Sequence, residues 1–344
     1  MTNTSQRSGG RSASKPQLKT QTLKELFDTE FKPREHLIAP WLREGESALI
    51  WSEPGVGKSM LSLSVALCIA GGGELMGWKS EKPRRVLVVD GEQHIEDIKE
   101  RAGLLMGTID GVDEELASEN VTIFARQDQD PRASFPDLVE DSGQDDIFNR
   151  AVKGEFDLVI LDNFSTLATI EDENSAAAFN PIMNFLLKMK QARIATILVH
   201  HANKSGKGFR GSTKLETTFE VTLGLQKPTS GEKRFGTAFD VVWTKYRRLK
   251  DETVSGRSVW LDGDPLVWGY KVSQHEEVNE MVRLVRTHDF TTQAQLAKTM
   301  NNMAVGKLSK LKHKAFEENL ISHAEWKECL EGPFDDFDDD DPQF

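Results

Sequence analysis

The chain has very few cysteines. Only Cys68 and Cys329 occur among its 344 residues, and they lie far apart in the sequence. Disulfide frameworks and zinc sites need cysteines clustered at short spacings, often together with histidine. The sequence therefore predicts neither a disulfide framework nor a zinc site, and it favours a reducing compartment, the cytoplasm.

Long apolar segments are also missing. No apolar run approaches the roughly 20 residues that a membrane-spanning helix needs, and only 38% of the residues are hydrophobic. Residues 1–20 are polar and rich in Ser, Gly, Lys and Arg, without the apolar centre of a secretory signal. We expect a disordered arm over residues 1–20 and no association with a membrane.

A positive net charge is missing as well. The formal net charge is −12, which disfavours a protein that coats nucleic acid by charge alone. The charges are uneven, because six aspartates crowd the last ten residues while basic residues gather in 204–210, 245–250 and 307–314. An acidic total is therefore compatible with basic binding surfaces.

Short continuous apolar runs alternate with helical segments between residues 41 and 250. The expected strands are 48–51, 85–90, 121–125, 158–162, 194–200, 221–225 and 239–245, followed by a hairpin of 259–261 and 267–272. Helices are expected at 59–70, 95–105 and 176–192, and Thr22 with Glu25 forms a capping box ahead of them. Continuous β-branched runs indicate an α/β domain over residues 21–273 with a mostly parallel central sheet buried on both faces.

The pattern changes after Ser273. Apolar residues at helical spacing predict an amphipathic helix: Val278, Met281, Val282 and Val285. Two more helices and a short strand pair near residues 321–326 would give a winged-helix-like module over residues 274–330. Residues 331–344 form an acidic tail.

A glycine-rich loop lies between the first expected strand and the first long helix. Residues 52–59 read Ser-Glu-Pro-Gly-Val-Gly-Lys-Ser, which is the P-loop pattern except that Ser52 stands where glycine is usual. Glycines let backbone N–H groups turn around phosphates, the lysine reaches the β- and γ-phosphates, and the last hydroxyl binds Mg²⁺. The sequence therefore predicts binding of ATP with Mg²⁺ by Glu53, Pro54, Gly55, Val56, Gly57, Lys58, Ser59 and Met60.

Carboxylates follow two other expected strands. Asp162 ends the apolar strand 158–162 and would hold Mg²⁺ beside Ser59, as a Walker B aspartate does. Hydrolysis also needs a group that orients or deprotonates water. Asp90 and Glu92, directly after the strand 85–90, are the candidates.

These motifs together resemble the RepA-like branch of the RecA/DnaB-type hexameric ATPases, whose founding member is a plasmid replicative helicase. The resemblance covers about residues 41–250. It rests on the loop 51–59, on Asp90-Gly91-Glu92, on Asp162-Asn163 and on the run Leu-Val-His-His-Ala-Asn-Lys at 198–204. It implies a RecA-like core, Glu92 as the catalytic glutamate, and a strand-end histidine, His201 or His200, that senses the γ-phosphate.

The resemblance further implies that neighbouring subunits share their sites. In DnaB-type helicases a Lys-x-Arg pair reaches into the ATP of the next subunit, and here the pair is Lys245 and Arg247. Residues two apart on a strand point the same way, so both can face one phosphate. Arg210 is a second candidate for this role. A homo-oligomeric ring, hexameric in this branch, would follow.

A basic loop offers a contact for single-stranded DNA. In RecA-like rings the loop after residues 194–200 faces the central channel, and here Lys204 and Lys207 would contact phosphates while Phe209 stacks or wedges. The other channel loop, 164–177, carries Glu171, Asp172 and Glu173 and suits phosphate poorly. An ordinary solvated loop is the alternative interpretation.

The C-terminal part carries two more candidate contacts. The expected third helix of the module carries a basic set, Lys307, Lys310, Lys312, His313 and Lys314, which suits DNA and an acidic protein equally. The tail 333–344 ends in Pro-Gln-Phe and resembles the acidic, Phe-terminated tail of bacterial and phage single-stranded DNA-binding proteins. We expect this tail to dock a replication protein.

The leading prediction is an ATP-driven hexameric DNA helicase or translocase in the replication of a plasmid, phage or other mobile element. A RecA-like recombinase or repair ATPase that forms filaments is the first alternative. An ATP-dependent loader or regulator that assembles on DNA is the second.

Overall fold

The computed structural model describes residues 18–170, 176–203, 208–210, 213–228, 236–248, 254–272, 274–300, 302–317 and 320–331. Lys204, Lys207, the acidic stretch 171–173 and the tail 333–344 lie outside these ranges. The chain divides into two units, residues 1–34 and residues 35–344.

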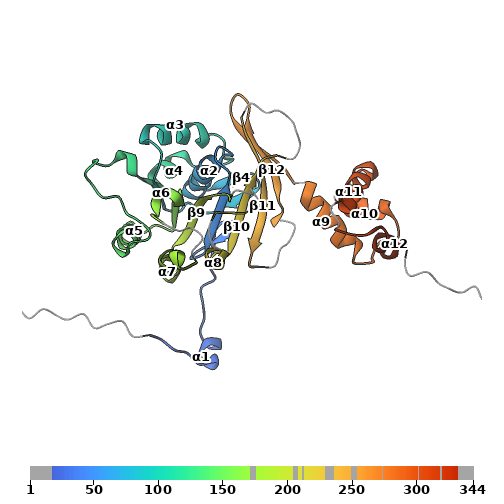
Figure 1. Ribbon diagram of the computed structural model, residues 1–344, viewed down its shortest axis with the longest axis horizontal. Helices are drawn as coiled ribbons and strands as arrows, with labels where there is room; N and C mark the ends of the chain where they lie inside the picture. The colour runs from blue at the N-terminus through green and yellow to red at the C-terminus, as the bar shows by residue number, and fades with distance from the viewer. Residues whose placement is uncertain are drawn as a thin grey trace, which may run out of the picture. The chain divides into compact units, whose positions relative to one another are not determined.

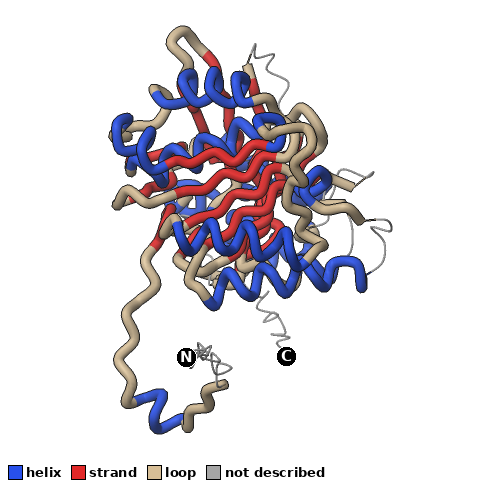
Figure 2. The backbone as a smooth tube through the Cα atoms, turned by 90° about the vertical axis from the view of Figure 1, so that its left-hand side faces the viewer, coloured by secondary structure: helices blue, strands red, loops and turns tan. Residues whose placement is uncertain are grey.

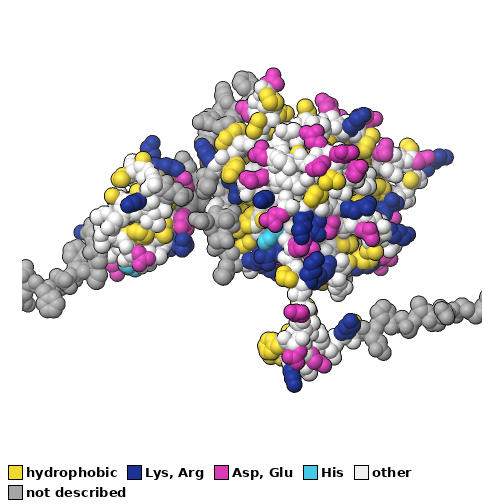
Figure 3. All heavy atoms as spheres, turned by 180° about the vertical axis from the view of Figure 1, so that it is seen from behind, with side chains coloured by type: hydrophobic (Ala, Val, Ile, Leu, Met, Phe, Trp, Pro, Cys, Tyr) yellow, Lys and Arg dark blue, Asp and Glu magenta, His cyan; other side chains and the backbone are white. Residues whose placement is uncertain are grey.

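The described part of the first unit contains one short helix, α1 (Leu23–Phe27). The expected capping box is present: Thr22 Oγ1 accepts a hydrogen bond from the Glu25 N–H, and the Glu25 carboxylate accepts one from the Thr22 N–H at 2.7 Å. Leu23 and Phe27 are 65% and 77% exposed, and hydrophobic side chains are visible on this segment in Figure 3. Capping hydrogen bonds therefore stabilise α1, and burial of its side chains does not.

The second unit is built on a sheet with nine strands in its described residues (Figure 1). Their order across the sheet is β13-β12-β11-β10-β3-β9-β8-β6-β7. In chain order the strands are β3 (Ser47–Ser52), β6 (Val86–Asp90), β7 (Val121–Ala125), β8 (Leu158–Asp162), β9 (Ala195–His201), β10 (Val221–Gln226), β11 (Thr237–Tyr246), β12 (Arg257–Asp262) and β13 (Val267–Val272). β10, β3, β9, β8, β6 and β7 pair in parallel, and the last three strands pair antiparallel. The expectation of an α/β core with a mostly parallel sheet is confirmed.

Helices cover both faces of this sheet (Figure 2). The core on one face contains residues of α2 (Lys58–Gly71), α3 (Ile95–Met106) and α4 (Glu114–Asn120). The core on the other face contains residues of α5 (Asp141–Lys153), α6 (Phe164–Leu167), α7 (Asn180–Gln191) and α8 (Thr213–Glu216). Successive strand residues alternate between the two cores, which explains the continuous apolar runs in the sequence.

Smaller elements complete the unit. Two antiparallel pairs, β1 (His36–Ile38) with β2 (Leu42–Arg43) and β4 (Gly73–Leu75) with β5 (Trp78–Ser80), were not expected from the sequence. The short 3₁₀ helices are η1 (Arg126–Asp128) and η2 (Ala176–Phe179). Trp78 anchors the second pair, because its ring meets Trp41 edge-on at 5.5 Å and Trp243 at 6.2 Å.

Helix α2 is almost completely buried, Cys68 included. Burial raises the pKa of the Cys68 thiol to about 12, so the thiol stays protonated at neutral pH. Cys329 is also buried, and neither cysteine forms a disulfide. Among the described residues, no helix has the length and apolar content that crossing a membrane requires.

Helices are the regular elements in the described residues of the last part of the chain. It contains α9 (Gln274–Val285), α10 (Gln293–Thr299), α11 (Val305–Glu317) and α12 (His323–Glu331), which share their own core. The strand pair expected near 321–326 is wrong, because α12 begins at His323 and its first turn is capped: Ser322 Oγ accepts a hydrogen bond from the Glu325 N–H at 3.0 Å. The structure therefore does not confirm a winged helix.

Candidate nucleotide site

Four polar side chains meet at the carboxyl edge of the parallel strands. Ser52 ends β3 and pairs with His201 at the end of β9, while Asp162 on β8 pairs with Asp90 on β6. Residues two positions earlier on these strands, such as Ile50 and Val88, lie in the core that contains α2. Because side chains alternate along a strand, all four polar residues lie on the α2 face. The sheet thus brings these groups to the start of α2.

The P-loop connects β3 directly to α2, as the sequence predicts. Gly57 is the N-cap of α2 with φ 122°, and Gly55 has φ 76°. Both values belong to the left-handed region that favours glycine. A Cβ atom on Gly57 would also lie 2.5 Å from the Thr237 side chain. Glycine is therefore required here by both backbone conformation and space, and the first N–H groups of α2 are left for an anion.

Lys58 lies inside this loop. Its side chain is 7% exposed, and Nζ donates to the Ser52 carbonyl at 3.1 Å, the Ser52 hydroxyl at 3.2 Å and the Glu53 carbonyl at 3.1 Å. Burial lowers the pKa of Lys58, and the charges of Asp162 and Glu92 oppose that change. The unusual serine is integrated into the loop, because its hydroxyl also donates to the Glu53 carbonyl at 2.7 Å.

The remaining predicted loop residues differ in exposure. Pro54 and Gly55 are exposed, Val56 is buried, and Ser59 and Met60 are half-buried. Glu53 forms an ion pair with Lys227 at 2.5 Å. A ligand on this loop would therefore meet the exposed backbone at 54–55 and the start of α2.

Asp162 supplies a buried carboxylate beside Ser59. It is 5% exposed, and Oδ2 accepts a hydrogen bond from the Ser62 hydroxyl at 3.0 Å. Burial, and next the charge of Asp90, raise the pKa of Asp162 to about 6, against the opposing hydrogen bonds of Ser62 and Ser59 and the charge of Lys58. A carboxylate and a hydroxyl next to a phosphate site are the oxygen ligands that Mg²⁺ prefers, so this donor set fits that ion.

Ser62 is a residue of this site that the sequence analysis missed. It follows Ser59 by three positions, so the two hydroxyls lie on one face of α2. That spacing was a usable signal once the loop had been recognised.

The hydrogen bonds of Glu92 and Asp90 distinguish the two carboxylates as candidates for the general base. Asp90 is 2% exposed and its Oδ1 accepts the N–H groups of Glu92 at 2.8 Å and Gln93 at 2.7 Å, while Oδ2 accepts from the Gln93 side chain at 2.6 Å. Asp90 therefore shapes the loop. Glu92 is exposed, and its carboxylate accepts a hydrogen bond from Asn163 Nδ2. Glu92 is thus the better placed candidate base.

The structure also distinguishes His200 from His201 as the candidate phosphate sensor. His200 is 1% exposed on the face away from α2, with its ring edge-on to Phe164 at 4.8 Å and Nε2 2.8 Å from the Arg210 carbonyl. Burial lowers the pKa of His200 to about 3, so the ring is neutral and structural at pH 7. His201 is half-buried on the α2 face beside Ser52, which leaves it as the candidate phosphate sensor.

The basic loop after β9 returns to the sheet. Asn203 N–H donates to the Gly208 carbonyl at 2.8 Å, and Ala202 forms a bridge with Phe209. Phe209 is 8% exposed in the core beside His200, so the expectation that it stacks on DNA is wrong for this conformation. Arg210 is exposed at the same sheet edge as the P-loop, with its N–H donating to the His201 carbonyl at 2.8 Å.

Lys245 and Arg247 lie at the opposite edge of the sheet from the P-loop. Lys245 pairs with Thr222, and β10 pairs with the first residues of β3 there. Lys245 Nζ donates to the Glu216 carbonyl, and Arg247 contacts the Thr217 carbonyl and Glu220. The pair therefore lies away from the P-loop of its own chain.

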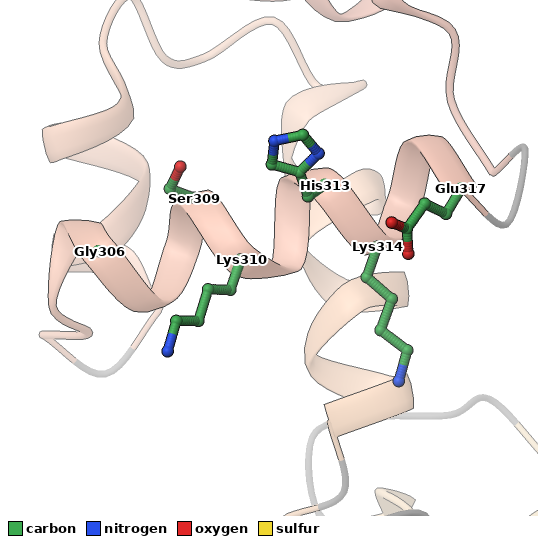
Figure 4. Close-up of a pocket in the computed structure, with 6 residues that line it drawn as sticks. All are labelled: Gly306, Ser309, Lys310, His313, Lys314 and Glu317. Carbon is green, nitrogen blue, oxygen red and sulfur yellow. The ribbon is translucent and has the colours of Figure 1, made fainter.

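The basic helix of the C-terminal part is α11. A shallow hollow of about 410 Å³ on this helix is lined by Gly306, Ser309, Lys310, His313, Lys314 and the acidic Glu317. Figure 4 shows Lys310 and Lys314 pointing to one side of the helix and Ser309 and His313 to the other. Lys307 instead pairs with Glu277 at 2.5 Å, and Lys312 lies over the rings of Phe316 and Trp326. The basic face is therefore smaller than the sequence suggests.

A parallel sheet with a P-loop between β3 and α2, and a buried carboxylate at the end of β8, defines a RecA-type P-loop ATPase. Within this class the chain belongs to the family of AAA domains, whose model matches residues 12–207.

The chain is similar to several known proteins. It is 23% identical over 217 residues to the DNA repair protein RadA of Campylobacter jejuni, a match that covers 62% of this chain and 41% of that relative. The chain thus spans less than half the length of this relative. A KaiC-like protein from Pyrococcus horikoshii OT3 matches with a TM-score of 0.48 and 17% identity, over 69% of this chain and 99% of its own. The flagellar accessory protein FlaH from Methanocaldococcus jannaschii matches with a TM-score of 0.44 and 14% identity, over 67% and 91%.

Proposed function

We propose that this protein hydrolyses ATP to move on single-stranded DNA as an oligomeric ring, in the manner of the RepA-like replicative helicases. One observation supports this proposal above the others. The carboxyl edge of the sheet holds the groups expected to bind MgATP, whereas Lys245 and Arg247 lie at the opposite edge, away from the P-loop of their own chain. In a ring, a second copy of the chain would bring this pair to the site.

The roles of the residues follow from their positions. Lys58 exchanges its contacts with Ser52 and Glu53 for the β- and γ-phosphates. Ser59 and Asp162 would hold Mg²⁺, which would neutralise charge at the phosphates. Glu92 accepts the proton of the attacking water, and His201 contacts the γ-phosphate.

The neighbouring subunit supplies Lys245 and Arg247. A planar guanidinium suits the charge spread over a transferring phosphoryl group, and an arginine delivered in trans is worth about 10³–10⁵ in rate in related ATPases. Arg210 is the second candidate, since it lies exposed at the nucleotide edge. A ring of six subunits is the proposed assembly.

DNA contact is proposed for two segments. Lys204 and Lys207 belong to the loop between Asn203 and Gly208, which leaves the sheet next to His201. The exposed face of α11 is the second segment proposed to contact DNA. The alternative is that this face binds an acidic partner protein. The acidic tail 331–344 is proposed to dock a replication protein.

ATPase assays with and without single-stranded DNA test the proposal. We expect DNA to stimulate wild-type hydrolysis. Lys58→Ala should abolish hydrolysis, and Glu92→Gln should leave only a small residual rate. Glu92→Gln should still bind ATP, because Glu92 does not belong to the phosphate loop. Hydrolysis that DNA does not stimulate would argue against the motor.

A repair or recombination ATPase is the second candidate, favoured by the similarity to RadA, which is described as a DNA repair protein. Unwinding of a forked duplex with ATP and Mg²⁺ supports the helicase. Negative-stain images separate the two directly, because closed rings support the helicase and filaments support the recombinase.

A further inference from the structure

Asn163 joins the candidate base to the segment that leaves β8. It follows Asp162 directly, is 5% exposed, and donates from Nδ2 to the Glu92 carboxylate. Its Oδ1 accepts the Thr166 N–H at 3.3 Å, which is the N-cap contact of α6. The side-chain nitrogen and oxygen of Asn163 thus bind two different segments, the loop of Glu92 and the start of α6.

The loop of Glu92 and the start of α6 are in direct contact. The Gly91 N–H donates to the Asp162 carbonyl at 2.8 Å, and a Cβ atom on Gly91 would lie 2.3 Å from Thr166 Oγ1. These contacts fix the backbone on either side of the base. They do not fix its carboxylate, for which Asn163 is the contact found among the described residues.

The carboxylate needs such a contact. Glu92 is exposed, and a glutamate side chain without a partner samples several rotamers. A general base has to lie within hydrogen-bond reach of its water, and a misplacement of about 1 Å can cost about 10²-fold in rate. A donor that is itself held by a helix cap restricts the carboxylate to one arrangement.

We propose that Asn163 is a positioning residue for ATP hydrolysis, which holds the Glu92 carboxylate toward the attacking water. This inference rests on the proposed ATPase function. Asn163 touches neither water nor phosphate in this role and acts only through Glu92.

Single-turnover hydrolysis and nucleotide binding, measured on the full chain, test the proposal. Asn163→Ala should lower the hydrolysis rate about 10- to 100-fold. Its affinity for a fluorescent ATP analogue should change by less than about threefold, because the phosphate loop keeps its contacts. Thr166→Val is the matched control, since it removes the hydroxyl that donates to the Asn163 carbonyl at 3.0 Å but keeps the link to Glu92.

The double variant separates positioning from general damage. In a Glu92→Gln background, Asn163→Ala should lower the residual rate by less than about twofold, because the group it acts on is already gone. The proposal would be overturned if Asn163→Ala lowered the hydrolysis rate as much in the Glu92→Gln background as in wild type. An unchanged or raised rate in Asn163→Ala alone would also overturn it. Equal losses in Asn163→Ala and Thr166→Val would assign the effect to the start of α6 instead. A wild-type chain without hydrolysis would refute the proposed function itself.

Discussion

Replacing His200 by glutamine should weaken the dependence of folding stability on pH. His200 is buried, with its ring Nε2 2.8 Å from the Arg210 carbonyl, and burial lowers its pKa to about 3. A neutral ring donates from Nε2 to that carbonyl, and Nδ1 then needs no proton. The amide of glutamine reaches the same carbonyl but does not titrate.

The direction and magnitude of this pH effect follow from the difference in proton binding between the folded and unfolded chains. An unfolded histidine has a pKa of about 6.5, so below that pH the unfolded chain binds a proton that the folded chain does not. The stabilisation is therefore complete above pH 6.5 and is lost as the pH falls toward 3. At about 1.36 kcal/mol per pH unit, the loss between pH 7 and pH 5 is about 2 kcal/mol.

Asp162 contributes with the opposite sign. Its pKa is raised to about 6, so its share of stability is present below about pH 4 and is lost as the pH rises through 6. Wild type and His200→Gln share this contribution, and it cancels in their difference.

Urea unfolding followed by tryptophan fluorescence at pH 5, 6 and 7 measures the effect. The free energy of unfolding of wild type should fall by about 2 kcal/mol more than that of His200→Gln between pH 7 and pH 5. His201→Gln is the comparison variant, because it removes a histidine at the nucleotide edge of the sheet and should lose hydrolysis. Equal slopes in wild type and His200→Gln would refute the structural role given to His200.

Three other changes test separate parts of the molecule. Arg247→Ala and Glu92→Gln should each have little activity alone, but mixing them should restore hydrolysis at about a quarter of the interfaces of a randomly mixed ring. No recovery would exclude an arginine supplied by the neighbouring subunit. Phe209→Ala should destabilise the fold by about 3–5 kcal/mol in thermal unfolding. Phe209→Leu should be stable and should leave DNA affinity unchanged. A loss of DNA affinity in Phe209→Leu would show that Phe209 contacts DNA. Lys310→Ala should lower DNA affinity and reduce the slope of log affinity against log salt by about 1, and an unchanged slope would favour a protein on α11.

The sheet and the P-loop were predictable because their signals are local. A buried parallel strand is apolar at every position, so β3, β6, β8 and β9 were visible to within one residue at each end. The loop needs its glycines and lysine at fixed spacing, and Gly57 shows why, since any side chain there meets Thr237.

The errors arose where distant contacts decide the outcome. Phe209 lies in a polar, glycine-containing stretch of the sequence, and its burial depends on contacts with the end of β9, among them the bridge to Ala202. The position of Lys245 was not an error, but the sequence could not give its sheet edge, because that depends on the pairing of β11 with β10. The helix α12 is different, because Ser322 and Glu325 form a Ser-x-x-Glu capping pattern that was readable and outweighs the short apolar run.

The nucleotide edge of the sheet also determines how hydrolysis can affect the rest of the chain. β8 and β9 are buried on both faces, so neither strand can move much without losing core contacts. The segment that leaves β8 starts within two residues of the site, because α6 begins at Phe164 after Asp162. The hydrogen bond from Asn163 to Glu92 connects the start of this segment to the candidate base. A ligand that displaces α6 therefore has to disturb that link, and Asn163→Ala should remove any such effect of the ligand on the hydrolysis rate.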